Sequence, residues 1–120
     1  MTTGAANWRV RPYHRSDIDG AMDLIAACYD PEAVNRERWR HDHFGNPDGI
    51  DGTMVAEAGS ALIGMQPMTV NRFSLDGTDI TAGVLTGVMV HPDWRRRGVF
   101  LGLLEACEHA AWAAGAALVT

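Results

Sequence analysis

The sequence predicts an α/β (α+β) fold, in which helices flank a mixed, mostly antiparallel β-sheet. Three observations support this prediction. Apolar residues recur at helical spacing near the N-terminus and again after residue 97, they alternate with period two between residues 53 and 90, and the sequence ends on a short apolar segment. With 120 residues, of which 47% are hydrophobic, the chain is long enough for its own core. We therefore expect residues 1–120 to form a single domain.

The N-terminal part is expected to contain a strand and two helices. Residues 8–13 alternate apolar and arginine side chains, as a short strand does. Ser16 offers an N-cap for a helix over residues 18–29, whose apolar residues share one face. A proline then ends this helix. A more polar helix is expected over residues 32–44, followed by a stop signal, Gly-Asn-Pro, at residues 45–47.

Three strands are predicted next, joined by tight turns. They cover residues 53–58, 61–75 and 78–90, and an Asp-Gly turn joins the second to the third. Pro67 cannot donate to a ladder, so a bulge or an edge is expected there. On the third strand, one apolar face is expected to carry Ile80, Ala82, Val84, Val88 and Val90.

A helix and a last strand complete the predicted fold. The helix begins near Arg97, and its buried stripe is predicted to contain Phe100, Leu103, Leu104, Cys107, Ala111 and Ala114. Gly115 is suited to end it, and residues 116–120 form a short strand. The order is therefore β-α-α-β-β-β-α-β. Because the last strand follows a crossover helix, we expect it to lie parallel to the strand before that helix.

Composition excludes several kinds of function. The net charge is −5 and all ten basic residues are arginine, so lysine chemistry and a Walker-type phosphate loop are absent, and general nucleic-acid binding is not expected. No apolar run is long enough to cross a membrane and no signal peptide is visible, which favours a cytoplasmic protein without a membrane partner. Cys28 and Cys107 lie on predicted apolar stripes, as buried free thiols do.

The segment most informative about function is Arg-Arg-Arg-Gly-Val-Phe-Leu at residues 95–101. Arginines at a helix start oppose the helix dipole, so three of them together suggest a bound anion. The free N–H groups of a helix N-terminus bind phosphate, and Gly98 allows the backbone to approach it closely. A diphosphate is the expected ligand. The alternative is a solvated arginine turn that caps a core helix.

This segment resembles the signature of the GNAT superfamily of N-acetyltransferases. That signature is Gln/Arg-x-x-Gly-x-Gly/Ala after a strand that ends Val-x-Val-x-Pro, which matches Arg95–Phe100 after Val88–Pro92. The predicted order of elements is similar to the first two-thirds of that fold, so the resemblance covers nearly the whole chain and implies that the fold is C-terminally incomplete. Phe100 replaces the usual small residue, as in the branch related to enhanced-intracellular-survival acetyltransferases.

The resemblance implies a site for acetyl-CoA as acyl donor, with no metal. Backbone groups of Val88 and Val90 would hold the pantetheine arm, and the N–H near Met89 or Val90 would polarise the thioester carbonyl. The strands near Val88 and Ala116 would splay apart to admit the donor. The residues that would surround the pyrophosphate are Arg95, Arg96, Arg97, Gly98, Val99, Phe100 and Leu101.

The acid and base for such a reaction are not identified by the sequence. Glu57, Asp79 and His91 are the candidates, but a surface charge, a turn residue and a loop-shaping residue are the simpler interpretations. His41 and His43 are two residues apart and point to different faces of a helix, which argues against a metal pair.

Two functions from different classes remain open at this stage. The first is an N-acetyltransferase acting by direct attack of a small-molecule or peptide amine, and the predicted helix with Arg36, Arg38 and Arg40 would border the acceptor or be a solvated face. The second is a non-catalytic acyl-CoA-binding or partner-binding fragment, in which an exposed sheet edge would favour a homodimer.

Overall fold

The chain folds into two four-stranded sheets, and it passes from one sheet to the other between β2 and β3, between β4 and β5, and between β6 and β7. The computed structural model describes residues 7–29, 32, 35, 37 and 50–120. Sheet A has the order β1-β3-β4-β7 and sheet B the order β2-β5-β6-β8. The strands of sheet A are β1 (Arg9–Pro12), β3 (Met54–Ala58), β4 (Ala61–Gln66) and β7 (Met89–Val90). Those of sheet B are β2 (Ile50–Asp51), β5 (Met68–Leu75), β6 (Thr78–Leu85) and β8 (Leu118–Val119).

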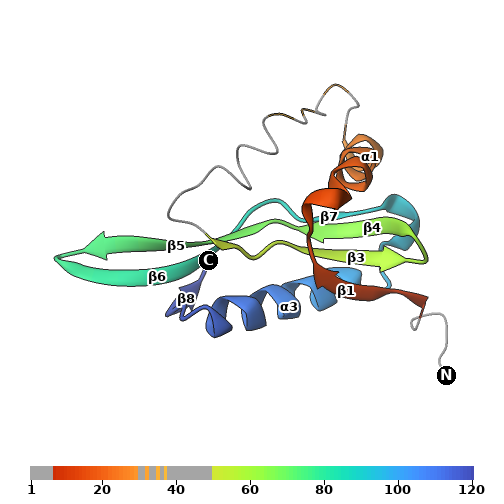
Figure 1. Cartoon of the computed structure of the whole chain (residues 1–120). Helices are drawn as coiled ribbons and strands as arrows, with labels where there is room; N and C mark the ends of the chain where they lie inside the picture. Colours follow the sequence, from red (N-terminus) through yellow and green to blue (C-terminus); the bar gives the residue numbers. More distant parts are fainter. Residues whose placement is uncertain (1–6, 30–31, 33–34, 36, 38–49) are drawn as a thin grey trace.

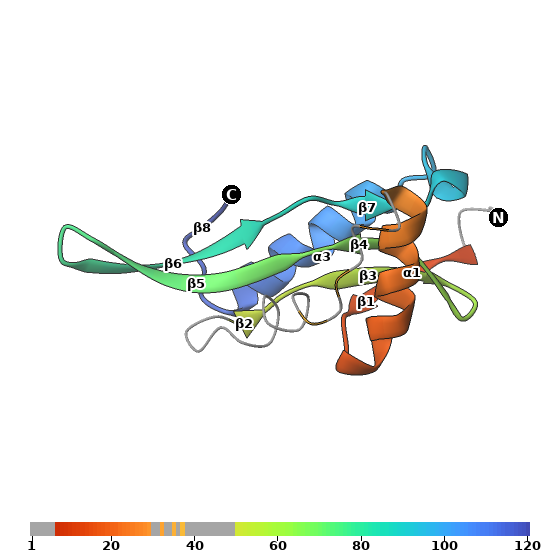
Figure 2. The ribbon, with the colours of Figure 1, turned by 90° about the horizontal axis from the view of Figure 1, so that it is seen from above.

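Two long helices cover opposite faces of sheet A. Helix α1 (Ile18–Cys28) lies on one face, and α3 (Val99–Ala113) runs under the other face towards sheet B (Figures 1 and 2). The hairpin of β5 and β6 projects beyond both helices. The pairs are antiparallel except for β6 and β8, which are parallel. This confirms the mixed, mostly antiparallel sheet and the parallel last strand.

The two longest predicted strands are each interrupted where the chain passes between the sheets. One strand over residues 61–75 was predicted, with a bulge or an edge at Pro67, whereas β4 of sheet A ends before Pro67 and β5 of sheet B begins after it. The uninterrupted strand predicted over residues 78–90 is wrong, because residues 86–88 separate β6 from β7. Met89, rather than Val88 or Val90, is therefore buried against α1. We call residues 52–53, 66–68 and 86–88, where the chain crosses between sheets, the seam.

Helix α3 packs closely on sheet A because the strand beneath it carries a glycine. A Cβ on Gly64 would lie 2.9 Å from Val99 Cγ1 and 3.1 Å from Leu103 Cδ1. Leu103, Cys107 and Ala111 are buried as predicted and Leu104 is partly buried, but Phe100 and Ala114 are exposed, contrary to prediction. In the first turn Val99 takes the buried position and Phe100 lines the pocket beside β7, and Ala114 is already the C-cap. This close packing fixes the N-terminus of α3 beside β7.

The N-terminal elements differ from the prediction at their ends. The first strand is confirmed, but Ser16 is not the helix cap, because it lies in the 3₁₀ turn η2 (Arg15–Asp17) that leads into α1. Strand β2 was not predicted, since two residues carry no periodicity. The predicted helix at residues 32–44, with its arginines and histidines, and the stop signal at residues 45–47 lie outside the described residues, apart from three isolated positions.

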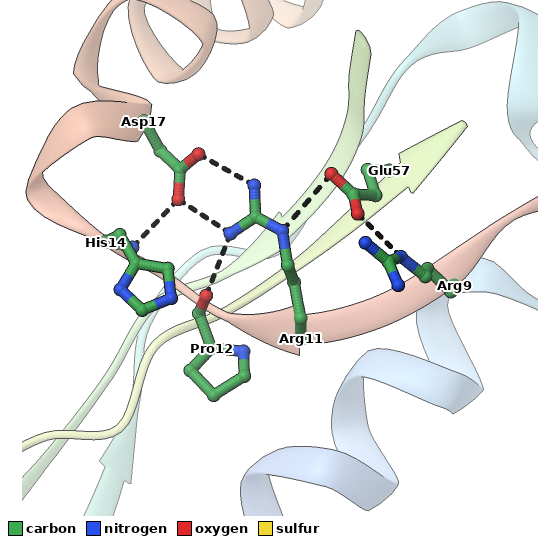
Figure 3. A network of polar contacts seen from close by, with 6 residues as sticks. All are labelled: Arg9, Arg11, Pro12, His14, Asp17 and Glu57. Carbon is green, nitrogen blue, oxygen red and sulfur yellow. Dashed lines mark hydrogen bonds and ion pairs between the residues drawn. The ribbon is translucent and has the colours of Figure 1, made fainter. Parts of the chain in front are cut away.

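A network of ion pairs fastens β1 to β3 and to the start of α1 (Figure 3). The Arg11 guanidinium donates to both oxygens of Asp17 at 2.8 Å, and its Nε lies 3.1 Å from Glu57 Oε2. Arg9 donates to the other Glu57 oxygen at 2.6 Å, and the His14 backbone N–H donates to Asp17 at 2.8 Å. The hydrogen bond from Arg11 is the main cause that lowers the pKa of Asp17, and those from Arg9 and Arg11 lower that of Glu57.

This network makes the stability of the protein depend on pH. Because the pKa of Asp17 is lowered in the folded state, its contribution is present above the unfolded value of about 3.9 and is lost as pH falls through the folded pKa. We expect Asp17→Asn to lower the free energy of unfolding by about 1–3 kcal/mol at pH 7, and by much less near pH 3. Urea unfolding at both pH values measures this. Asp79→Asn on the projecting hairpin is the control, and an equal loss for Asp17→Asn at both pH values would contradict the role of the charge.

Candidate functional site

The segment between β7 and α3 leaves a row of backbone N–H groups facing outward. After the 3₁₀ turn η4 (Pro92–Trp94), the backbone φ is +65° at Arg96 and +82° at Gly98. Alternation of positive and negative φ turns successive N–H groups to one side, the geometry that binds anions. The first N–H groups of α3, at Val99, Phe100 and Leu101, have no helical acceptor, and no described residue accepts from them.

The arginine side chains around this turn are held in different ways. Arg95 Nε donates to the Val90 carbonyl at 3.1 Å, and Arg97 stacks on the Trp94 ring, 4.8 Å from its centroid. All three arginines are exposed, and Arg96 lines the pocket beside the turn. A Cβ on Gly98 would meet no atom within 4 Å, so the space over the turn is open. The turn therefore presents both bare amides and positive charge to an anion.

A pocket of about 460 Å³ opens between this turn, β7 and the end of α1. Every site residue predicted from the sequence lines it except Arg97, whose guanidinium is placed over Trp94. Three further residues line it, and the sequence analysis did not assign them to a site: Cys28, Tyr29 and Trp94. Cys28 is 62 residues from Val90, to whose carbonyl its Sγ donates at 3.5 Å. No spacing in the sequence indicates this contact, because it depends on α1 packing against β7.

The ladder of sheet A determines which backbone groups of β7 face the pocket. The His91 N–H donates to Ile63 O at 2.8 Å, so alternation along the antiparallel pair turns the Met89 N–H towards β4 and the Val90 N–H away from it. The Val90 carbonyl also points away, and it accepts from Arg95 and Cys28. The oxyanion donor suggested at Met89 or Val90 is thus better supplied by Val90.

The thiol of Cys28 is a neutral group in this pocket. Burial raises its pKa, an effect that the neighbouring Arg95 reduces only in part. Cys28 is partly buried rather than fully buried as predicted, whereas Cys107 is buried, and both are free thiols. The Tyr29 hydroxyl lies 3.8 Å from the position of a Cβ on Gly87, where β6 has ended and β7 has not begun. Tyr29 therefore places a polar group at the seam end of the pocket.

The candidates for acid and base do not line this pocket. Glu57 lies on β3 and forms ion pairs with two arginines of β1. Strand β4 separates β3 from β7. Asp79 lies on the projecting hairpin, opposite Ser74. The His91 ring accepts from the Asp93 N–H at 3.1 Å and so shapes the turn. The structure thus gives Glu57 a role in an ion-pair network, Asp79 a place near the hairpin turn, and His91 a role in shaping the loop.

The strands expected to splay belong to different sheets. Strand β7 pairs with β4 in sheet A, whereas β8 pairs with β6 in sheet B. The β6–β8 contact extends to a hydrogen bond from Leu85 N–H to Thr120 O, and the chain crosses to the other sheet directly after Leu85.

No helix among the described residues combines the length and the hydropathy that a membrane span requires.

Two sheets that separate beside the unpaired amides of a helix N-terminus are the arrangement expected from the resemblance to acetyltransferases of the GNAT class. A family model described as acetyltransferase (GNAT) domain matches residues 9–120. The chain therefore belongs to the GNAT acetyltransferase family. No curated protein matches the sequence at a significant level.

Solved structures share the fold at low sequence identity. The structure of AAC(6')-Iy with a bisubstrate analogue, CoA-S-monomethyl-acetylneamine, is 16% identical with a TM-score of 0.74, over 94% of this chain and 77% of that one. The same aminoglycoside N-acetyltransferase in complex with CoA gives 16% and 0.73, over 94% and 74%. Glucosamine-6-phosphate N-acetyltransferase from Arabidopsis thaliana gives 17% and 0.73, over 94% and 80%. These likenesses confirm the predicted fold class.

Proposed function

We propose that the protein is an N-acetyltransferase that transfers the acetyl group of acetyl-CoA to an amine by direct attack. The observation that carries the proposal is the row of unpaired amides at the start of α3, which adjoins three exposed arginines and opens into the pocket. Similar folds with bound CoA or a CoA analogue support the donor. Residues 1–120 form the acetyl-CoA-binding domain in this proposal.

The residues divide the binding of the donor between them. The amides from Arg96 to Leu101 hold the pyrophosphate, and the charges of Arg95, Arg96 and Arg97 neutralise it. The backbone at Val88, directly before β7, and at Val90 on the free edge of β7 binds the pantetheine arm, and the Val90 N–H donates to the thioester oxygen. Met89 contributes from the buried side by packing β7 against α1.

The reaction requires one bond to form and one to break. The neutral amine attacks the thioester carbon, an N–C bond forms, the C–S bond breaks, and the thiolate takes up a proton while the new amide loses one. A thiol of ordinary acidity is a tolerable leaving group, so positioning and the oxyanion contact supply much of the effect. The aminoglycoside and glucosamine-phosphate enzymes of similar fold support a small-molecule amine as acceptor.

Calorimetry and a thiol assay test this function. We expect saturable binding of CoA and of acetyl-CoA, and release of free thiol when acetyl-CoA and a panel of small amines are supplied together. If calorimetry shows no saturable binding of CoA or acetyl-CoA up to millimolar concentration, the proposal is refuted. Binding without thiol release from any amine would instead favour a non-catalytic acyl-CoA-binding module.

A further inference from the structure

Gln66 is an unusual residue in the core of this protein. Only 2% of it is exposed, and it and Thr53 are the buried polar residues among the described positions. An amide removed from water is costly unless its hydrogen bonds are made again inside the protein. Gln66 lies at the end of β4, on the seam, where the chain is about to enter sheet B. The hydrogen bonds of its side chain therefore indicate why a polar residue is buried at this position.

The side chain of Gln66 joins the two places where long strands cross the seam. Its Nε2 donates to the Pro67 carbonyl at 3.0 Å and to the Thr86 carbonyl at 2.6 Å. The Thr86 N–H in turn donates to the Pro67 carbonyl at 3.1 Å. Both amide hydrogens of Gln66 are thus used, one on each crossing strand. A methionine of similar size would fill the space but make neither bond.

The segment that Gln66 holds is the wall of the pocket at its seam end. Thr86 is the first residue after β6, and Val88, two residues later, lines the pocket. Gly87 lies between them, and the Tyr29 hydroxyl faces it from α1. Residues 86–88 form no strand pairing of their own. The hydrogen bonds of Thr86 with Gln66 and Pro67 hold the start of this segment, and Val88 packs against the core at its end.

We propose that Gln66 is a positioning residue: its two hydrogen bonds across the seam hold residues 86–88 in place and so shape the part of the pocket that receives the acyl end of the donor. Gln66 does not line the pocket and acts only through the backbone. The assignment of the ligand rests on the proposed function, whereas the effect on the backbone does not. The two are therefore tested by separate measurements.

The first measurement is amide hydrogen exchange in the absence of any ligand. We expect Gln66→Met to speed the exchange of the Thr86 N–H by about tenfold, because the Thr86 carbonyl loses its donor and only the hydrogen bond from the Thr86 N–H to Pro67 then holds this residue across the seam. The amides of α3 should keep their protection. Thr53→Val is the matched control, since Thr53 is equally buried on the seam but bonds to Met68 on β5. It should leave Thr86 unchanged.

The second measurement is binding of acetyl-CoA compared with adenosine 3′-phosphate 5′-diphosphate, which lacks the pantetheine arm. We expect Gln66→Met to lower the affinity for acetyl-CoA by about tenfold and to leave the affinity for the fragment unchanged. The reason is that the proposed phosphate site lies at the other end of the pocket. Gln66→Glu, which retains one donor when the buried carboxyl is protonated, should give an intermediate loss and provides a second variant should the methionine variant not fold.

The outcomes separate the two proposals. Unchanged Thr86 exchange in a folded Gln66 variant would overturn the positioning role, whatever the protein binds. Faster exchange together with an equal loss of affinity for donor and fragment would also overturn it, because the effect would then not be confined to one end of the pocket. If wild-type protein binds no acetyl-CoA, the proposed function fails, and the exchange measurement alone decides the positioning role.

Discussion

Replacing Arg96 and Arg97 together by alanine is expected to weaken CoA binding by about 10–100-fold, while binding of pantetheine, which carries no phosphate, stays unchanged. This loss corresponds to about 1.4–2.8 kcal/mol for the two guanidiniums together. It is less than two fully formed charged hydrogen bonds would contribute, because both side chains are exposed to solvent. Arg96 should account for the larger share, because it lines the pocket and Arg97 is stacked on Trp94. Calorimetry with both ligands measures the difference.

The control for this experiment is an arginine far from the turn. Arg72 is exposed on β5 in the projecting hairpin, and Arg72→Ala changes the net charge without touching the pocket. It should leave the affinity for CoA unchanged. Added salt screens exposed charges, so it should weaken CoA binding by the wild-type protein, and it should weaken binding by the double variant less. An equal loss for CoA and pantetheine would contradict a phosphate role for the two arginines.

Leu103→Ala is expected to destabilise the protein by about 2–5 kcal/mol, a large share of the stability of a domain of this size. Leu103 is fully buried in the centre of α3, and its Cδ1 fills the space over Gly64. Truncation leaves a cavity at the contact that holds α3 on sheet A. Denaturant unfolding followed by circular dichroism measures the change.

Leu101→Ala in the same helix is the matched control, because the same atoms are removed from a side chain that is 61% exposed. Its free energy of unfolding should change by no more than about 0.5 kcal/mol. If both leucine variants lost the same stability, α3 would not pack on the sheet through the face described above.

The turn of unpaired amides at the start of α3 could be predicted from the sequence because it is local. Residues 95–101 are consecutive, and an Arg-Gly segment between a strand and a helix specifies backbone amides at a helix start wherever the helix goes. The Asp-Gly turn is of the same kind, since Asp76 and Gly77 have φ of +51° and +80° as a two-residue hairpin requires. Period also identified the buried face of α3 from Leu103 to Ala111, but not the exposure of Phe100, because Val99 takes the buried position in the first turn and Phe100 lines the pocket.

The sequence by itself determined the fold class, most of the described helices and strands, and the turn of unpaired amides at the start of α3, because each depends on residues that are neighbours along the chain. Only the tertiary structure decided that α1 brings Cys28 and Tyr29 to the far side of the pocket, that the long strands cross between two sheets, and that Gln66 joins the crossings. These features depend on contacts between segments that are distant in sequence. Side-chain periodicity specifies which face of an element is buried, but not which other element covers it.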